Sequence, residues 1–395
     1  MRNIVWLIVV LLAMAACRQE PHYTITGKFP GMPDGLKVYL ESRVGVMVPI
    51  DSAITRGEQF VFHGKMDFPR FCRIRIPDTI DKIGKEQEIW VENSDIALTC
   101  SWDSLRYNDA MVTGSVSHDL YNTLHEQRKF LYKENMNLHR EYFMCYEQYA
   151  YQGIFSPEQK AAGIEVAKQQ AEISRKVREL EEKFVRANPS SMVSLMVLNK
   201  LLGSDGRYSR EEMQELINMI DPELKGTPEY MEVEKVMNEH LKTAKGEHFI
   251  DFTVMDKNGK EGRFSDYVQS GKYNLLECWA SWCGPCRAEI PHLKHVHDIC
   301  GDKFNIIAVS VDKNEAEWEK ALAEERPAYL QLRNIPDAYG KRVQNYYGIT
   351  GIPYTLLLDG EGRIVEAEVR GATLDWILMK LDVINADGKG LNNSK

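Results

Sequence analysis

The sequence predicts a C-terminal α/β domain with a central mixed sheet flanked by helices, preceded by a small β-sandwich and a helical region. In residues 246–390, short apolar runs alternate with amphipathic ones, as strands and helices do when they interleave in one sheet. Residues 17–115 show period-two alternation, and residues 116–245 show apolar residues at helical spacing. The 395 residues suit two or three domains of roughly 100–200 residues each.

In the β-rich region, side-chain character alternates along three segments with the period of two that is typical of strands, and glycine and proline turns separate them. The segments are residues 23–27, 36–40 and 72–76. Each such strand must bury one of its faces. We therefore predict a small sandwich of two sheets. The region shows no group of residues typical of catalysis.

The helical region carries clear helix boundaries. Ser156 and Pro157 supply an N-cap and a first-turn proline, and Asn188 with Pro189 ends that helix. A capping box at 209–212 precedes a further amphipathic run. We interpret the region as a helical bundle or spacer. A dimerising coiled coil is the alternative, but its apolar seam should persist over about three heptads, and it does not.

In the C-terminal domain, apolar runs predict strands at 275–279, 306–311, 355–358 and 364–369, followed by a helix at 373–384. A glycine-containing turn at 359–362 joins the last two strands.

The first 16 residues are typical of a targeting segment. Arg2 precedes an apolar run from Ile4 to Ala16, which is shorter than the roughly 20 residues of a membrane span. Small residues before Cys17 resemble a bacterial lipoprotein signal, which implies that Cys17 is lipidated and becomes the mature N-terminus. A plain secretory signal with an incidental cysteine is the alternative. In both cases the mature protein leaves the cytoplasm.

The charge balance argues against nucleic-acid binding. The formal net charge is −9, and no long basic run is present to contact phosphates.

The motif Cys283-Gly284-Pro285-Cys286 directly follows a predicted strand and opens a helix. Two cysteines separated by two residues can close a disulfide within one turn. At a helix N-terminus, unpaired N–H groups and the dipole favour a thiolate on Cys283. Pro285 is tolerated because its missing N–H costs nothing in the first turn. Cys286 can then resolve a mixed disulfide on Cys283 at high effective molarity.

At this motif, the chain resembles the thioredoxin superfamily, and within it the TlpA/ResA-like envelope thiol–disulfide oxidoreductases, over about residues 246–385. Further matches are Pro291, which kinks the active-site helix in these proteins, residues 309–312 with Trp318, residues 347–355, and the turn at 358–362. The resemblance implies a redox-active disulfide and no other cofactor. Residues 51–53 and 57–64 resemble an uncharacterised β-domain that often precedes this module in envelope lipoproteins.

The same resemblance gives roles to four further residues. Pro353 is expected to be cis and to lie against the disulfide, while the backbone at Ile352 pairs with a substrate strand. Glu277 stands where thioredoxins often carry a buried aspartate that accepts a proton from the second cysteine. Its apolar neighbours favour burial over a solvated carboxylate at the strand edge. Glu289 stands where the TlpA/ResA-like pattern has a glutamate.

Three histidines follow the dithiol and raise the question of a metal site: His292, His295 and His297. We interpret them as helix-surface residues and expect no bound metal. Trp282 is expected to cover the disulfide, in contact with the substrate.

The leading interpretation is an enzyme, a protein disulfide reductase or isomerase, that acts on exported protein thiols or disulfides. It would be lipid-anchored in the bacterial cell envelope and face the periplasm. A copper metallochaperone is an alternative, but its cysteines are typically three residues apart. Peroxide reduction by a peroxiredoxin-like protein is a further alternative, but the Pro-x-x-x-Thr-x-x-Cys pattern of that class is absent from this sequence. A structural envelope adaptor would not need an intact dithiol motif.

The direction of electron flow is not fixed by the motif. Its Gly-Pro dipeptide is that of thioredoxin, at about −270 mV, rather than that of an oxidant such as DsbA, at about −120 mV. The dipeptide therefore favours a reductant, which outside the cytoplasm needs a membrane electron donor.

Overall fold

The computed structural model describes residues 22–44, 46–77, 84–154 and 156–385. Cys17 and the predicted signal segment lie outside these residues, as does the end of the predicted C-terminal domain, 386–390. Contacts divide the chain into two compact units, Met1–Glu126 with Ser191–Val193, and Gln127–Ser190 with Ser194–Lys395. Within the described ranges, no helix combines the length and apolar character needed to cross a membrane.

The first unit contains the predicted sandwich of two sheets. One sheet has the order β4-β1-β7-β8 and the other β3-β2-β5-β6. Ile25 and Phe62 from the first sheet share one buried core with Leu40 and Ile74 from the second. The strands are β1 (Tyr23–Lys28), β2 (Lys37–Val44), β3 (Val46–Ile54), β4 (Gln59–Gly64), β5 (Arg70–Ile76), β6 (Lys85–Val91), β7 (Asp95–Thr99) and β8 (Met111–Thr113).

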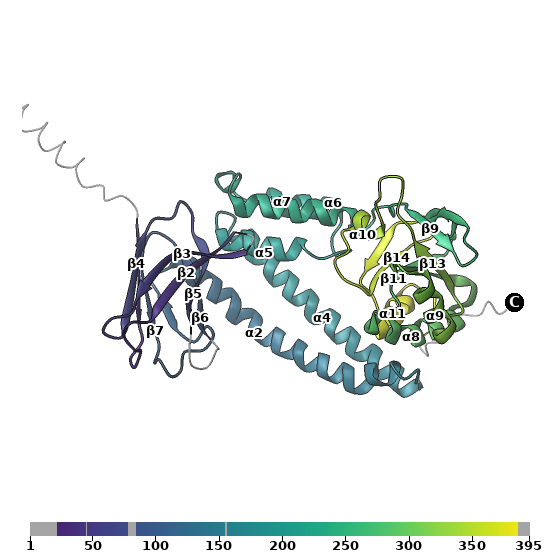
Figure 1. The fold of residues 1–395 in the computed structure, drawn as a ribbon, viewed down its shortest axis with the longest axis horizontal. Helices are drawn as coiled ribbons and strands as arrows, with labels where there is room; N and C mark the ends of the chain where they lie inside the picture. Colours follow the sequence, from purple (N-terminus) through teal and green to yellow (C-terminus); the bar gives the residue numbers. More distant parts are fainter. Residues whose placement is uncertain (1–21, 45, 78–83, 155, 386–395) are drawn as a thin grey trace, which may run out of the picture. The chain divides into compact units, whose positions relative to one another are not determined.

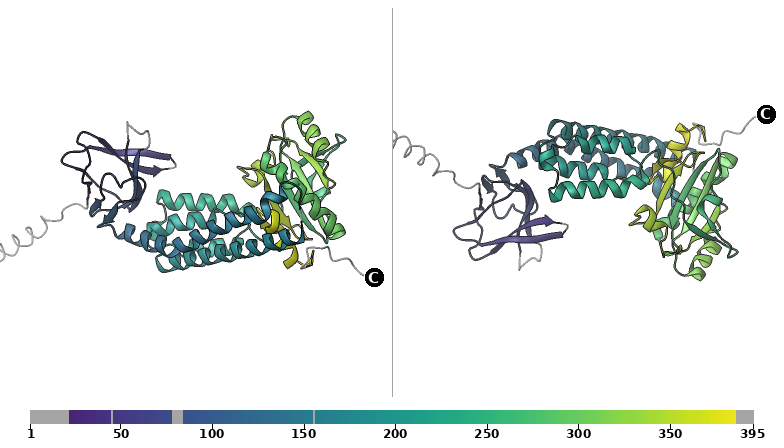
Figure 2. Two further views of the ribbon diagram at one scale, coloured as in Figure 1. Left: turned by 90° about the horizontal axis from the view of Figure 1, so that it is seen from below. Right: turned by 90° about the horizontal axis from the view of Figure 1, so that it is seen from above.

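The helical region follows the predicted boundaries closely. Ser156 caps α4 with Pro157 at its first turn, and Ser209 forms a capping box with Glu212 at the start of α6. Leu138 of α2 packs with apolar residues of α4, including Ile173, and both views of Figure 2 show the helices beyond residue 127 side by side. The helices are α2 (Val116–Tyr142), α3 (Gln148–Ala150), α4 (Pro157–Ala187), α5 (Met192–Leu202), α6 (Arg210–Asn218) and α7 (Pro228–His240), with the π-helical segment η1 (Phe143–Glu147) after α2.

The C-terminal domain contains a seven-stranded mixed sheet, in the order β10-β9-β13-β12-β11-β14-β15. Strands β11, β12 and β13 run parallel, and the other pairs are antiparallel. This confirms the predicted α/β architecture. The strands are β9 (Thr253–Asp256), β10 (Glu261–Arg263), β11 (Tyr273–Trp279), β12 (Phe304–Ser310), β13 (Leu330–Asn334), β14 (Tyr354–Leu358) and β15 (Ile364–Ala367).

Helices complete this domain. They are α8 (Gly284–Cys300), α9 (Glu315–Glu325), α10 (Val343–Tyr347) and α11 (Gly371–Lys380). α8 and α11 contact one another beside the sheet (Figure 1). β11 lies between β12 and β14 and is buried along nearly its whole length. The loop that follows it and leads to α8 therefore begins at a well-packed strand.

Two predicted boundaries were wrong by a few residues. The predicted strand at 364–369 ends at Ala367, because Glu368 takes a left-handed conformation with φ 55°. The predicted helix at 373–384 begins at Gly371 and ends at Lys380. It cannot continue to Ile384, because Asp382 also has a positive φ of 55° and its N–H turns back to the carbonyl of Met379.

Candidate active site

Cys283 and Cys286 form a disulfide at the start of α8, with Cα atoms 5.3 Å apart. Cys283 is the N-cap residue, and its sulfur accepts the N–H of Cys286 at 3.2 Å. Cys283 is 5% exposed, whereas Cys286 is fully buried. Of the two cysteines only Cys283 keeps any exposure, and its sulfur lies at the helix N-terminus, which favours a thiolate.

The loop before the dithiol is fixed by a buried aspartate at the end of the neighbouring strand. The backbone N–H and the hydroxyl of Ser281 donate to the two carboxylate oxygens of Asp312, at 2.8 and 2.7 Å. Ser310, the last residue of β12, donates its hydroxyl to the same carboxylate. The sequence predicted no role for Asp312 beyond a family match, although an acid at the carboxyl end of a parallel strand is a usable signal.

The peptide bond between Ile352 and Pro353 is cis, as the sequence predicted. The carbonyl oxygen of Ile352 lies 3.7 Å from the sulfur of Cys283. Trp282 is 68% exposed, so its ring is accessible beside the dithiol. The structure thus brings the backbone of Ile352 to the sulfur of Cys283, with Pro353 next in the chain.

Glu277 is buried, as expected, at 1% exposure in the middle of β11. Neither carboxyl oxygen has a hydrogen-bond partner among the described residues. Burial, and secondly the charge of Glu289, raise the pKa of Glu277 to about 8. Glu289, whose charge contributes to this shift, lies on α8, the helix that carries the dithiol.

Glu289 belongs to a buried array of charged side chains that the sequence did not reveal. His292 contacts Glu289 Oε1 through Nδ1 at 2.8 Å and Asp375 Oδ1 through Nε2 at 3.0 Å. Burial alone would lower the pKa of His292, but the two carboxylates outweigh it and raise the pKa to about 10. His292 is therefore a fixed imidazolium between two acids, one on α8 and the other on α11.

The helical region covers this array. The hydroxyl of Tyr142 accepts the N–H of Ala372 at 3.0 Å, beside the Gly371 N–H that donates to Glu289 at 2.8 Å. The ring of Tyr146 meets the ring of His292 edge-on, with centroids 6.3 Å apart. Gly371 has φ 52°, and a Cβ there would lie 2.5 Å from the Tyr142 hydroxyl, so this close approach needs glycine.

The interpretation of the three histidines as helix-surface residues was wrong for His292, which is fully buried, and His295 and His297 are only half-buried. The reason is that α11 and η1 pack over the part of α8 that a single amphipathic helix would expose. Within the described ranges, no group of three or more His, Cys, Asp or Glu is arranged to hold a metal ion.

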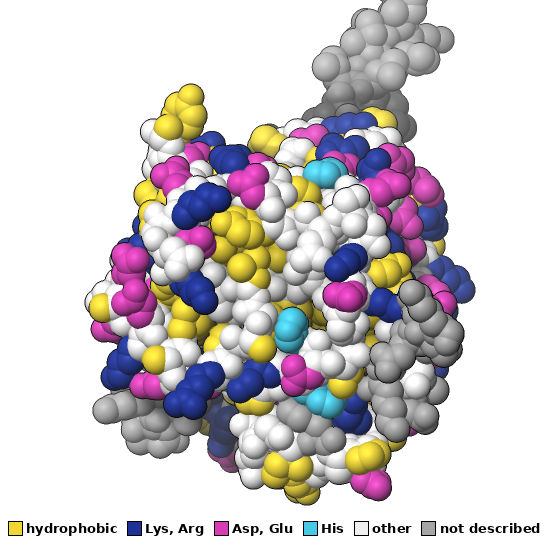
Figure 3. Space-filling view, turned by 90° about the vertical axis from the view of Figure 1, so that its right-hand side faces the viewer, with side chains coloured by type: hydrophobic (Ala, Val, Ile, Leu, Met, Phe, Trp, Pro, Cys, Tyr) yellow, Lys and Arg dark blue, Asp and Glu magenta, His cyan; other side chains and the backbone are white. Residues whose placement is uncertain are grey.

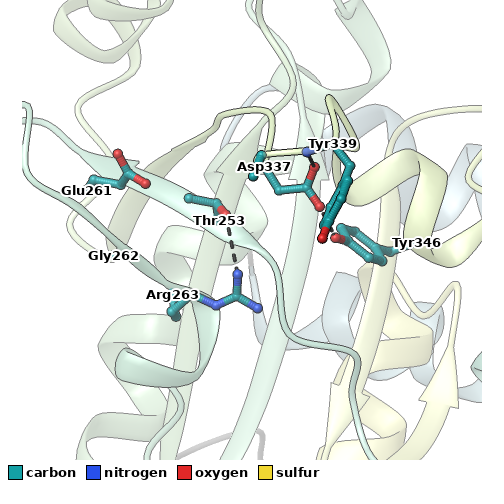
Figure 4. A pocket seen from close by; sticks show the side chains of 8 residues that line it. Thr253, Glu261, Gly262, Arg263, Asp337, Tyr339 and Tyr346 are labelled. Carbon is teal, nitrogen blue, oxygen red and sulfur yellow. Dashed lines mark hydrogen bonds between the residues drawn. The ribbon is translucent and has the colours of Figure 1, made fainter.

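Two hollows lie on the surface of this domain. One, of about 360 Å³, is beside the dithiol and is lined by Ser281, Arg287 and residues of α9. The other, of about 650 Å³, lies at the β9–β10 hairpin, where Figure 4 shows Arg263 across from Tyr339 and Tyr346. The lining of the second hollow includes no residue of the dithiol loop or of α8, whereas Ser281 and Arg287 of the first flank the dithiol in the chain.

Comparisons with known proteins agree with this geometry. A family model described as thioredoxin-like matches residues 271–364, and a model described as a domain of unknown function (DUF4369) matches residues 23–121. The thiol:disulfide interchange protein HelX of Rhodobacter capsulatus is 33% identical over 129 residues, which are 32% of this chain and 70% of HelX. The thiol-disulfide oxidoreductase ResA of Geobacillus thermodenitrificans is 30% identical over 147 residues, 37% of this chain and 81% of ResA.

Among solved structures, the thioredoxin domain of a thiol-disulfide oxidoreductase from Bacteroides vulgatus is 32% identical. The match covers 35% of this chain and 98% of that domain, with a TM-score of 0.32.

The raised pKa of Glu277 predicts how the free energy of unfolding depends on pH. Between about pH 4.5 and 8, the folded chain holds a proton on Glu277 that the unfolded chain has lost, so the free energy of unfolding falls as pH rises. Glu277→Gln removes this contribution. The unfolding free energy of the variant minus that of the wild type should therefore grow by about 1.4 kcal/mol per pH unit across this window.

Urea unfolding at several pH values measures that difference, and the other titrating groups cancel in it. Below pH 4.5 it should be constant. A difference that stays constant from pH 4 to 8 would show that Glu277 titrates as an ordinary carboxylate.

Proposed function

Because the chain belongs to the family of thioredoxin-like thiol–disulfide oxidoreductases, we propose that it reduces disulfides of exported proteins in the bacterial cell envelope through Cys283 and Cys286. The observation that carries the proposal is a cysteine pair closed into a disulfide at one helix N-terminus, in which Cys283 keeps 5% exposure and Cys286 keeps none. The cysteine that keeps some exposure is the one at the N-cap, and the fully buried one is within a turn of it.

In the proposed reaction, the thiolate of Cys283 attacks one sulfur of a client disulfide and releases the other client sulfur as a thiolate. The thiol of Cys286 then loses its proton to Glu277 and attacks Cys283, which releases the second client thiolate and forms the Cys283–Cys286 disulfide. Two electrons pass from the enzyme dithiol to the client. Glu277 can accept the proton because its pKa of about 8 is near that of a thiol, and Glu289 contributes to that value.

Several features beside the dithiol support protein clients. The backbone at Ile352 can pair with an extended client strand, while Trp282 and the hollow at Ser281 and Arg287 offer side-chain contacts. On the face drawn in Figure 3, acidic and basic side chains are interspersed. From the backbone at Ile352 and the exposed ring of Trp282 we propose that clients are recognised mainly through their backbone and apolar groups.

The reductant direction is supported by the Gly284–Pro285 dipeptide between the cysteines. A reductant in the envelope needs electrons from a membrane donor, which we propose re-reduces the Cys283–Cys286 disulfide. The names of HelX and ResA describe thiol–disulfide exchange and oxidoreduction, the chemistry proposed for this chain.

The thiol assignment predicts different results for the two cysteines. Cys283→Ser should abolish reduction of insulin by dithiothreitol above the uncatalysed rate, because the nucleophile is lost. Cys286→Ser should instead accumulate a mixed disulfide between Cys283 and the client, visible on non-reducing gels.

The wild-type couple should equilibrate with glutathione nearer to about −270 mV than to about −120 mV. A potential near the second value would make the chain an oxidant. Full activity of Cys283→Ser would overturn the assignment of the nucleophile.

We also propose that Cys17 carries a lipid anchor, on the strength of the apolar run and small residues that precede it. In cell fractionation, wild-type protein should sediment with membranes, and Cys17→Ser should move to the soluble envelope fraction. Mass spectrometry of the wild-type N-terminus should show an acylated cysteine. An unmodified N-terminus at another residue would contradict the anchor.

A further inference from the structure

Tyr354 connects the segment beside the dithiol to the helical region. It is the residue after Pro353, and its side chain is only 4% exposed. Its hydroxyl donates to Asp205 Oδ2 at 2.8 Å, across 149 positions of sequence. Two residues before Tyr354, the carbonyl of Ile352 lies 3.7 Å from the sulfur of Cys283. This hydrogen bond therefore joins the helical region to the strand that borders the thiol site.

Asp205 is itself held in place from the helical side. Its other oxygen, Oδ1, accepts the hydroxyl of Thr243 and contacts Nδ1 of His240, both at 2.5 Å. Burial alone would raise the pKa of Asp205, but hydrogen bonds from His240, Thr243 and Tyr354 lower it. The carboxylate therefore stays ionised, and a charged acceptor binds the tyrosine hydroxyl more strongly than a neutral one.

The backbone next to Asp205 fits tightly against the same part of the sheet. Gly206 has φ 61°, and a Cβ at this position would lie 2.6 Å from the backbone nitrogen of Ala367. Ala367 belongs to β15 and pairs with Leu356 of β14, the strand that Tyr354 begins. The helical region therefore contacts both β14 and β15, through the Tyr354–Asp205 hydrogen bond and through the close packing of Gly206.

From these contacts we infer that Asp205 is a positioning residue for client binding, which acts through Tyr354 on the backbone at Ile352 and Pro353. The inference rests on the proposed function, because it concerns the strand to which a protein client would pair. It gives the helical region a part in recognising protein clients. A small disulfide, which needs only the sulfur of Cys283, should depend little on this contact.

The test compares two buried tyrosines in the full-length chain. Tyr354→Phe removes the hydroxyl that binds Asp205. The matched control is Tyr208→Phe, because Tyr208 is also 4% exposed and donates to a carboxylate, Glu182 Oε1, at 2.9 Å, within the helical region. Each variant thus loses one tyrosine–carboxylate hydrogen bond, but only the bond of Tyr354 is next to the segment that borders the thiol site.

The measurements are KM and kcat with insulin and the rate with 2-hydroxyethyl disulfide. Tyr354→Phe should raise KM for insulin by roughly threefold to tenfold, because the backbone at Ile352 is then less well preorganised for the client strand. Its kcat and its rate with the small disulfide should stay within about twofold of wild type, as for lost binding alone. Tyr208→Phe should leave all three values unchanged.

A second pair of variants keeps the test decisive if Tyr354→Phe does not fold. Asp205→Asn retains an oxygen that can accept the tyrosine hydroxyl, whereas Asp205→Ala does not. The asparagine variant should keep a KM for insulin closer to wild type than the alanine variant does. A residue that only stabilised the fold would lower the rates with both substrates in parallel.

Equal KM values for Tyr354→Phe and Tyr208→Phe, with normal wild-type activity, overturn this inference alone. So does a parallel loss of kcat on both substrates. Inactivity of the wild-type chain toward both substrates overturns the proposed function, and this inference with it.

Discussion

The carboxyl group of Glu277 lies within the central sheet, with no hydrogen-bond partner among the described residues and almost no exposure. An ionised carboxylate in such a place costs several kcal/mol unless it is paired, so the fold favours the protonated form. The cost of burial therefore turns a glutamate into a group that exchanges its proton near pH 8. Glu277 lies on β11, the strand that leads into the dithiol at the start of α8.

Charged groups on α8 and α11, and tyrosines of the helical region, surround the environment of Glu277. Glu289, the charge that raises the pKa of Glu277 further, accepts hydrogen bonds from the imidazolium of His292 and from the N–H of Gly371. Asp375 completes the array from α11. Because Tyr142 and Tyr146 from the helical region close over these groups, the charges behind the dithiol are shielded from water by residues more than 100 positions earlier in the chain. The helical region thus contacts the thioredoxin-like domain through side chains and is also joined to it in sequence.

What the sequence predicted correctly was local or had a strong motif. The caps at Ser156 and Ser209, the dithiol at a strand–helix junction and the cis bond before Pro353 all depend on residues close together in the chain. The burial of Glu277 followed from its apolar neighbours. The bridge from His292 to Asp375 spans 83 positions, and that from Asp205 to Tyr354 spans 149. No periodicity or spacing signals such a pairing, because each partner alone is an ordinary polar residue and the two are far apart in the chain.

The central claim is that Glu277 takes the proton from Cys286 as the mixed disulfide is resolved. The most direct measurement is the pH dependence of that single step, followed by rapid mixing after a mixed disulfide has been formed on Cys283. In the wild type, the rate should rise with pH to a plateau with an apparent midpoint near 8, because a general base acts only when ionised. Glu277→Gln should resolve the mixed disulfide more slowly and lose that midpoint. Identical profiles for the two proteins would contradict the account and leave Glu277 as a buried residue without a part in the chemistry.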